Sequence, residues 1–197
     1  MLTEIPYSWQ LLINIGCNIL ASGIFIFLLL WLGKPKFNIS CFICAMPETN
    51  PEFNKGKDNV IKYTMKIVNK SIFHAFDTDF ELRLMSPTFH TAAHSNLMII
   101  SLPARAAKMK HIPRYRKNYK DKDPFALFAN LIHTTEDLRS FLNVPENYLE
   151  LKVTVRHGLT GLADTFIQTF SNPDCIKPNH KFGFGKRLDV IPFNEGV

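Results

Sequence analysis

Charged residues are missing from the first part of the chain. The stretch Trp9–Leu32, WQLLINIGCNILASGIFIFLLLWL, contains no Asp, Glu, Lys, Arg or His. A buried helix of a soluble protein rarely lacks a polar face over such a length. At about 1.5 Å per residue the stretch would form a helix of roughly 36 Å, enough to cross a hydrocarbon core of about 30 Å. We therefore predict a membrane span.

Lysine and arginine are also absent from the whole segment before residue 34. A cleaved signal peptide has a basic start, a shorter apolar run and small residues at its cleavage site. Here the first ten residues hold one acid and no base, and the apolar run ends in Leu30-Trp31-Leu32. These features favour a retained anchor over a signal peptide. Lys34 and Lys36 follow the span, so the positive-inside rule predicts a cytoplasmic C-terminal side.

The expected organisation is a tail over residues 1–8, a single span over residues 9–33 and a cytoplasmic domain over residues 34–197. The expected location is the inner membrane of a bacterial cell. The chain has 23 Lys and Arg against 17 Asp and Glu, a net charge of +6. In a domain tethered to a membrane, this excess first indicates attraction to anionic lipid headgroups. A nucleic acid or nucleotide is the second interpretation.

The predicted span carries one polar face. Asn14, Cys17, Asn18 and Ala21 recur at a spacing that places them on one side of a helix. Amides that face lipid are costly, so this side is expected to meet another helix through self-association. A narrow polar lumen is an extension of the same idea. The alternative is that Asn14 reaches the interface and Asn18 bonds to its own backbone.

Several enzyme signatures are lacking. The chain has no glycine-rich phosphate loop and no nucleophile elbow. Of its four cysteines, Cys41 and Cys44 form a CxxC with no second copy, and residues three apart on a strand point to opposite faces. We expect no disulfide in a reducing cytoplasm, no cofactor, no bound metal and no catalytic residue. An unfamiliar hydrolase remains a third possibility for function.

Two weaker groups could hold a cation. His90 and His94 are four residues apart, a spacing that binds metal on a helix, but no acid or cysteine near them supplies an obvious third ligand. Asp77, Asp79 and Glu81 alternate, which would place three carboxylates on one strand face. The competing interpretations are two loop histidines and a solvated strand face.

Alternation of apolar and polar residues dominates the rest of the chain. It is clearest over residues 60–68, 80–84 and 149–155, with the polar positions expected to face solvent. Further strands are predicted over residues 37–46, 97–102, 163–170 and 182–191. Ser86-Pro87 is predicted to end the third strand. These short strands predict an Ig-like antiparallel β-sandwich, with a small barrel as the alternative.

One or two short helices are expected inside the sandwich. The first would begin at Asp123-Pro124 and use the apolar residues Phe125, Phe128, Leu131 and Ile132. The second is the run LRSFLN, for which residues 134–137 look like an N-cap. The predicted fold class is therefore mainly β, with an N-terminal transmembrane helix.

Residues 60–84, VIKYTMKIVNKSIFHAFDTDFELRL, read as a strand, an Asn-containing turn and a second strand that follow a membrane helix. This arrangement, together with residues 149–190, resembles the Ig-like cytoplasmic domain of inward-rectifier potassium channels. It also resembles the Ig-like domains of small bacterial membrane proteins. The channels have two spans with a filter between them, whereas Phe182-Gly183-Phe184-Gly185 lies far from the single span here. The resemblance therefore implies a fold and not channel activity.

The best surface feature is a basic segment between residues 105 and 122. Its sequence interleaves cations with tyrosines, which suits phospholipid headgroups, RNA or a nucleotide; a solvated loop or edge excursion is the simpler interpretation. The predicted binding cations are Arg105, Lys108, Lys110, Arg114, Arg116, Lys117 and Lys120.

The function expected from these features is binding or sensing at the cytoplasmic face of the membrane by an oligomeric, single-pass protein. The alternative is a bacterial defence-type effector. In that case the helices would oligomerise and disrupt the membrane when the sandwich binds a signal.

Overall fold

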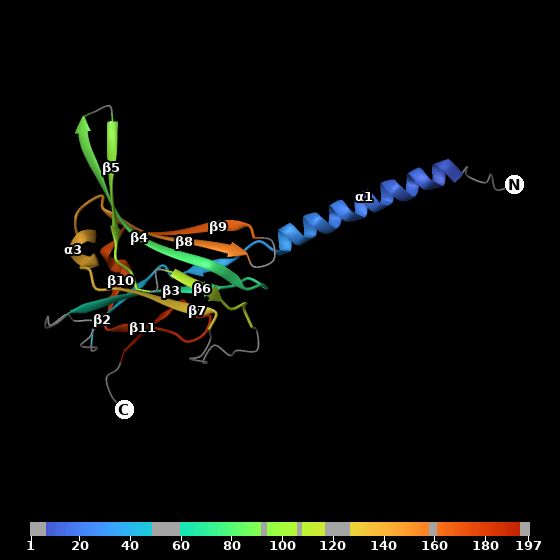
Figure 1. The fold of residues 1–197 in the computed structure, drawn as a ribbon. Coiled ribbons are helices and arrows are strands. Elements are labelled where there is room, and N and C mark those ends of the chain that lie inside the picture. Colours follow the sequence, from blue (N-terminus) through green and yellow to red (C-terminus); the bar gives the residue numbers. More distant parts are fainter. Residues whose placement is uncertain are drawn as a thin grey trace.

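A computed structural model describes residues 7–48, 60–91, 94–105, 108–116, 127–157 and 161–193, and gives only the backbone at residues 8, 88–91, 94–96, 108 and 157. Within this part of the chain, one long helix leads away from a β domain made of layered sheets (Figure 1). A two-stranded arm projects from the domain on the side away from the helix. The predicted mainly β fold with an N-terminal apolar helix is confirmed.

Helix α1 (Tyr7–Leu32) contains the predicted span of residues 9–33 except for Gly33. By length and composition, Trp9–Leu32 could cross a membrane, and none of it is buried in the protein. The amide of Gly33 donates to the carbonyl of Leu29 at 2.8 Å, which closes the last turn. Pro35 follows, and its ring cannot continue a helix. The chain therefore leaves α1 and enters the first sheet within a few residues.

The first sheet, sheet A, is built on β3 (Ile61–Asn69). Strand β7 (Ala129–Thr134) lies antiparallel along one edge of β3. Along the other edge, β2 (Ile43–Pro47) pairs with the first half of β3 and β1 (Phe37–Ile39) with its end. The short strand β10 (Ile176–Pro178) joins β2 in parallel. The clear alternation of residues 60–68 therefore marks the centre of the sheet.

The single strand predicted over residues 37–46 is broken in two. Ser40 is buried between β1 and β2, and its amide donates to the carbonyl of Lys66 at 2.9 Å. Its hydroxyl accepts a hydrogen bond from the amide of Phe42 at 3.1 Å. A serine side chain that bonds the backbone two residues on favours a local turn over a continuous strand. That competition explains the break.

The second sheet, sheet B, is built on β4 (Ala75–Thr91). On one edge, β6 (Lys108–Ile112) pairs with the start of β4, and β5 (His94–Leu102) pairs with its later part. On the other edge lies β8 (Tyr148–His157), followed outward by β9 (Ala163–Phe170). The strands predicted over residues 149–155 and 163–170 are therefore both present, as the neighbours β8 and β9. The prediction that residues 105–122 form only a loop or an edge excursion misses the strand β6.

Strand β4 continues through Ser86 and Pro87, so the prediction that they end it is wrong. Pairing with β8 stops at Met85, whereas pairing with β5 continues, with Pro87 opposite Leu97. Beyond Met85, the edge of β4 on the β8 side is therefore no longer paired with β8. Proline is tolerated on such an edge because no hydrogen bond between strands is lost there. The continuation of β4 with β5 forms the projecting arm (Figure 1).

The helix predicted around residues 125–132 is also wrong where the structure describes it. Ile132 and Thr134 are buried while Leu131 is exposed, an alternation that belongs to strand β7. Backbone pairing with β3, more than 60 residues away in sequence, decides the conformation over the local spacing of apolar residues. The second predicted helix is present as α3 (Leu138–Leu142), with the Asp137 carboxylate accepting from the amide of Ser140 at 3.1 Å.

The C-terminal part forms smaller elements. The short 3-10 helix η1 (Pro173–Cys175) is capped by Asn172, whose side chain accepts from the amide of Asp174 at 2.8 Å. The last strand material, predicted over residues 182–191, is a pair of short strands, β11 (His180–Phe182) and β12 (Val190–Pro192). The segment between them turns at Gly185, whose φ of 61° suits glycine.

The hydrophobic core lies between sheets A and B. Met65 and Ile67 of β3 are fully buried, as are Leu151 and Val153 of β8. These residues belong to one continuous cluster that also includes Leu138 of α3. The two sheets therefore act as the layers of a sandwich, and they do not close into a barrel.

Candidate functional site

The outer face of sheet A is covered, contrary to the prediction that its polar residues face solvent. Lys66 is 3% exposed and Thr64 is 9% exposed. The cover is the C-terminal strap, which we define as residues 180–189. Gly183 donates its amide to the carbonyl of Asp189 at 3.0 Å, and this bond closes the strap upon itself. A Cβ atom at Gly183 would lie about 3.0 Å from the Arg187 Cβ, closer than ordinary van der Waals contact, so glycine suits this close approach.

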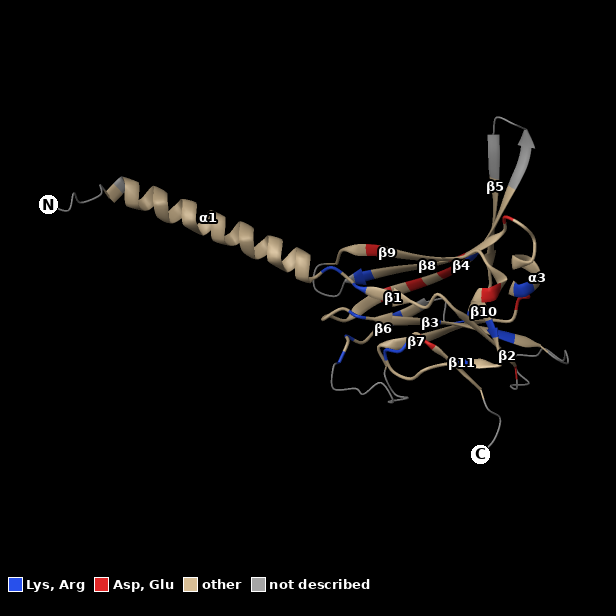
Figure 2. Cartoon of the chain, turned by 180° about the vertical axis from the view of Figure 1, so that it is seen from behind, with Lys and Arg blue, Asp and Glu red and all other residues tan. Residues whose placement is uncertain are grey.

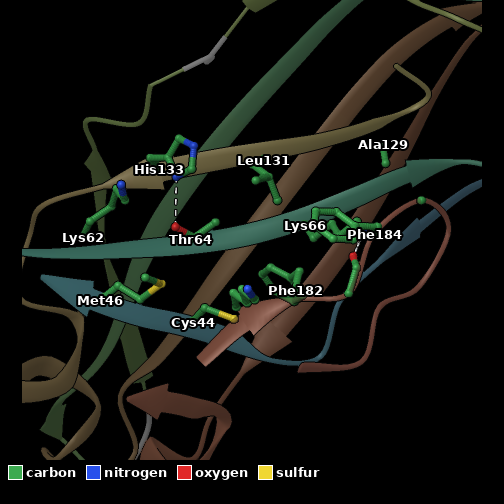
Figure 3. Close-up of a pocket in the computed structure, with 13 residues that line it drawn as sticks. Cys44, Met46, Lys62, Thr64, Lys66, Ala129, Leu131, His133, Phe182 and Phe184 are labelled. Atoms are coloured by element: carbon green, nitrogen blue, oxygen red, sulfur yellow. Dashed lines mark hydrogen bonds between the residues drawn. The ribbon is translucent and has the colours of Figure 1, made fainter. Parts of the chain in front are cut away.

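A cavity of about 340 Å³ lies between the strap and sheet A. Met46, Leu131 and Phe182 supply apolar walls, and Lys66 lies toward the strap (Figure 3). Lys62 and Lys181 also line the cavity, and no Asp or Glu is among the described residues that do so. Ligand sites of proteins commonly have volumes of about 300–1,000 Å³ and combine apolar walls with a few polar groups. This cavity has that composition and an excess of positive charge.

Lys66 is the central polar group of the cavity. Its ammonium donates a hydrogen bond to the carbonyl of Gly183 at 2.5 Å. Burial lowers the pKa of Lys66 to about 8, and the negative charge of Asp189 opposes that effect. Lys66 takes part in none of the ion pairs found among the described residues. An ammonium has three N–H donors, so a single carbonyl satisfies only part of the hydrogen-bonding capacity of a buried ammonium.

The other polar groups of the cavity are uncharged or paired. Burial raises the pKa of the Cys44 thiol to about 12, which keeps it protonated and makes it a poor nucleophile. Burial lowers the pKa of His133, and its Nδ1 lies 3.0 Å from the Thr64 hydroxyl. Lys62 pairs with Glu48 at 3.5 Å. The arrangement therefore favours binding of a ligand over nucleophilic chemistry.

Sequence reasoning missed this site. Lys66 occupies a polar position of an alternating strand, and such positions usually face solvent. The useful signal was Phe182-Gly183-Phe184-Gly185, where aromatic residues alternate with glycines that permit a close approach to another backbone. Nothing in that tetrapeptide indicates which sheet face it covers.

The structure divides the predicted basic segment. Arg105 forms an isolated bridge with His133 beside β7, while Lys110 lies on β6 next to Asp77 and Asp79. Arg114 follows β6. Of the remaining predicted cations, Arg116 is exposed beside Arg114, the side chain of Lys108 is outside the described part, and Lys117 and Lys120 are outside it altogether.

Arg114 and Arg116 lie at the end of the domain that is joined to α1. Between them, the amide of Tyr115 donates to the carbonyl of Ser71 at 3.1 Å. The Ser71 hydroxyl in turn accepts from the amide of Lys36 at 2.8 Å, four residues after α1. Figure 2 shows further basic residues gathered around this junction. We call this surface the basic end; its cations are Lys34, Lys36, Lys70, Arg114, Arg116 and Arg156.

Exposed apolar and aromatic residues lie among the cations of the basic end. Ile72 is 55% exposed and Phe76 is 41% exposed. The Phe76 ring centroid lies 5.1 Å from that of His111, and His111 stacks on His74 at 4.8 Å. The pKa of His74 is lowered by burial and by the nearby charges of His111, Arg114 and Arg116. A surface that combines cations with exposed apolar side chains suits a membrane interface.

The predicted association face of α1 is uncovered in the single chain. Asn14, Cys17, Asn18 and Ala21 are all exposed, and none of the helix window is buried. A carbon placed on Gly16 would also meet no neighbour. The structure therefore leaves this face available to another helix.

The remaining candidate sites are dispersed. Cys41 is exposed while Cys44 is buried, and the thiols are free. Glu81 pairs with Arg83 at 2.6 Å, and Asp77, at a bulge with φ of 44°, pairs with Arg156 at 3.8 Å.

His90 and His94 lie on β4 and β5, the two strands of the arm, and their side chains are outside the described part. Within the described residues, no three histidine, cysteine or acidic side chains approach closely enough to hold a metal ion.

Comparison with known proteins gives no further guide, because no protein-family model matches the chain and no curated protein matches it.

Proposed function

We propose that the protein is a membrane-anchored binding module whose β-sandwich works against an anionic, cytoplasmic membrane surface. The observation that supports this is the position of the basic end. Six cations and two exposed apolar residues lie at the end of the domain from which α1 leaves. If α1 spans the bilayer, the same end meets the headgroups.

The charges at this end favour contact with lipid. Among the described residues, Lys34 pairs with Asp164 at 3.9 Å and Arg156 with Asp77 at 3.8 Å. The side chains in these pairs are largely exposed, apart from a less exposed Asp164, so the pairs contribute little to stability and can exchange for lipid phosphates. Each cation near an anionic surface contributes about 1 kcal/mol before screening. Arg114 and Arg116 add to this attraction.

The proposal is tested with the full chain in lipid nanodiscs, using amide hydrogen exchange. In anionic nanodiscs at low salt, residues 70–76 and 111–116 should exchange more slowly than in zwitterionic nanodiscs. High salt should remove the difference, because these charges are screened. The double variant Arg114→Ala, Arg116→Ala should lose most of the protection. Arg139→Ala, which removes an exposed cation of α3 at the opposite end, should keep it. Equal exchange in both lipids would contradict the proposal.

A second candidate function is supported by the uncovered polar face of α1. In it, the helices of several chains associate and permeabilise the membrane when the sandwich binds a signal. Cys17 lies on that face, so oxidation of a Cys41→Ser variant in nanodiscs or liposomes should give dimers cross-linked through Cys17. Replacing Asn14 and Asn18 with Leu should reduce cross-linking, and dye release from liposomes would distinguish permeabilisation from association alone. Monomers under all conditions would exclude this candidate.

A further inference from the structure

The cavity under the C-terminal strap has a feature that the membrane interface does not explain. Lys66, only 3% exposed, lies between sheet A and the strap. Replacing buried charge with well-packed apolar side chains is often neutral or stabilising. Lys66 therefore costs stability, and the cavity beside it offers a reason for its presence.

The charge in the cavity indicates the sign of a ligand. Lys62 is engaged by Glu48, and the Lys181 ammonium lies 5.2 Å from the centre of the Phe193 ring. Lys66 has the Gly183 carbonyl, with two further N–H donors of its ammonium left for other acceptors. A carbonyl carries only a partial negative charge. An anionic group would complement the ammonium far better, since hydrogen bonds between ionised partners are roughly twice as strong as neutral ones.

The walls of the cavity indicate the rest of the ligand. Leu131 and Phe182 line it from opposite sides, sheet A and the strap, and the Cys44 thiol adds a weakly polar surface (Figure 3). Burial and the nearby cations Lys62 and Arg105 lower the pKa of His133, which disfavours a second positive charge there. We propose that this cavity binds an organic anion of a single negative charge with an apolar body, its charged group against Lys66.

The first experiment uses the full chain in zwitterionic nanodiscs and a fluoronaphthoate as the probe, followed by fluorine NMR. The parent should bind the naphthoate beyond the background of empty nanodiscs, and the uncharged fluoronaphthamide should bind at least about tenfold more weakly. Lys66→Met should lose at least about tenfold in affinity for the naphthoate. Lys152→Met, on the outer face of sheet B, should bind like the parent. Equal binding of acid and amide, or no binding above background, would overturn the proposal.

A second measurement separates a direct contact from a change of fold. Incorporation of lysine labelled with carbon-13 at Cε makes the lysine side chains visible by NMR without changing their ammonium groups, and the Lys66→Met spectrum identifies the Lys66 signal. Saturating naphthoate should raise the pKa of Lys66 above its value in the free protein, because a nearby negative charge favours the ammonium. An unchanged pKa in a protein that binds the naphthoate would place the ligand elsewhere and overturn the proposal.

Discussion

Strands β3 and β8 have nearly the same pattern but different surroundings. On β3, Tyr63 and Met65 alternate with Thr64 and Lys66; on β8, Leu151 and Val153 alternate with Lys152 and Thr154. Their apolar residues meet in one core. Their polar residues differ, because the strap covers sheet A while Lys152 and Thr154 stay partly exposed. Alternation thus identifies the face that joins the core and says nothing about what covers the other face.

The largest expected effect concerns the apolar residues, which β3 and β8 bury in the same core. Met65→Ala and Leu151→Ala each remove a fully buried side chain from the shared core. Each should lower the free energy of unfolding by about 2–5 kcal/mol. Lys152→Ala, on the outer face of β8, should change it by less than about 0.5 kcal/mol. Urea unfolding of the full chain in mild detergent, followed by circular dichroism, measures these values. A small effect at either core position would contradict a common core.

A pH series on Lys66 tests the difference between the two strands, which is that the polar residues of β3 are covered and those of β8 are not. Burial lowers the pKa of Lys66 from 10.5 to about 8 in the folded protein. Below pH 8 both states hold the proton, and the folded state bears the full cost of the buried charge. Between about pH 8 and 10.5 the unfolded state binds more protons, so stability rises with pH. Relative to Lys66→Met, the parent should gain about 3 kcal/mol over this window.

Other groups face Lys66 from each element packed against it, namely Cys44 of β2, His133 of β7, Lys62 of β3, and Lys181 and Asp189 of the strap region. The Cys44 thiol acts in the opposite direction, because burial raises its pKa from 9.0 to about 12. Above pH 9 it favours the unfolded state in both proteins. The difference between parent and Lys66→Met removes most of that contribution and leaves only the lowering of the Cys44 pKa by Lys66 itself. A difference that does not change with pH would mean that the ammonium is not buried.

The smallest expected effect concerns the open face of sheet B. Arg83 pairs with Glu81 of its own strand at 2.6 Å and with Glu150 of the neighbouring strand β8 at 3.6 Å. Arg83→Gln should lower the free energy of unfolding by no more than about 1 kcal/mol, because partly exposed ion pairs are screened by water and salt. The loss should shrink as salt is raised. Urea unfolding at low and high salt measures it, and a large loss that is insensitive to salt would mean that this face is covered too.

The elements that could be predicted from the sequence are those whose signals are local. The uncharged run of α1, the alternation in β3 and β8, and the Asp137 cap of α3 each need only neighbours in sequence. Strand β7 could not be predicted in this way, because its apolar spacing suits a helix as well as a strand. Its pairing with β3 decides between them.

The candidate sites show the same limit. The cations around Arg114 could be found as a group, but their division between β7 and the basic end depends on how β6 pairs with β4. The cavity beside Lys66 depends on a strap more than 110 residues further along the chain. A local pattern contains no information on which remote segment covers a polar strand face.

Strand β4 has a consequence for the reach of the protein. Its 17 residues run without a break from Ala75, beside the basic end, to the arm. At about 3.3 Å per residue the strand has a contour length of about 55 Å. The arm lies at the far end of this strand from the basic end, so it points away from the headgroup layer when the basic end faces the bilayer. Leu97 to Ile100 are all exposed on the arm. A molecule that binds to them would then do so in the aqueous phase, at a distance from the membrane that depends on strand β4.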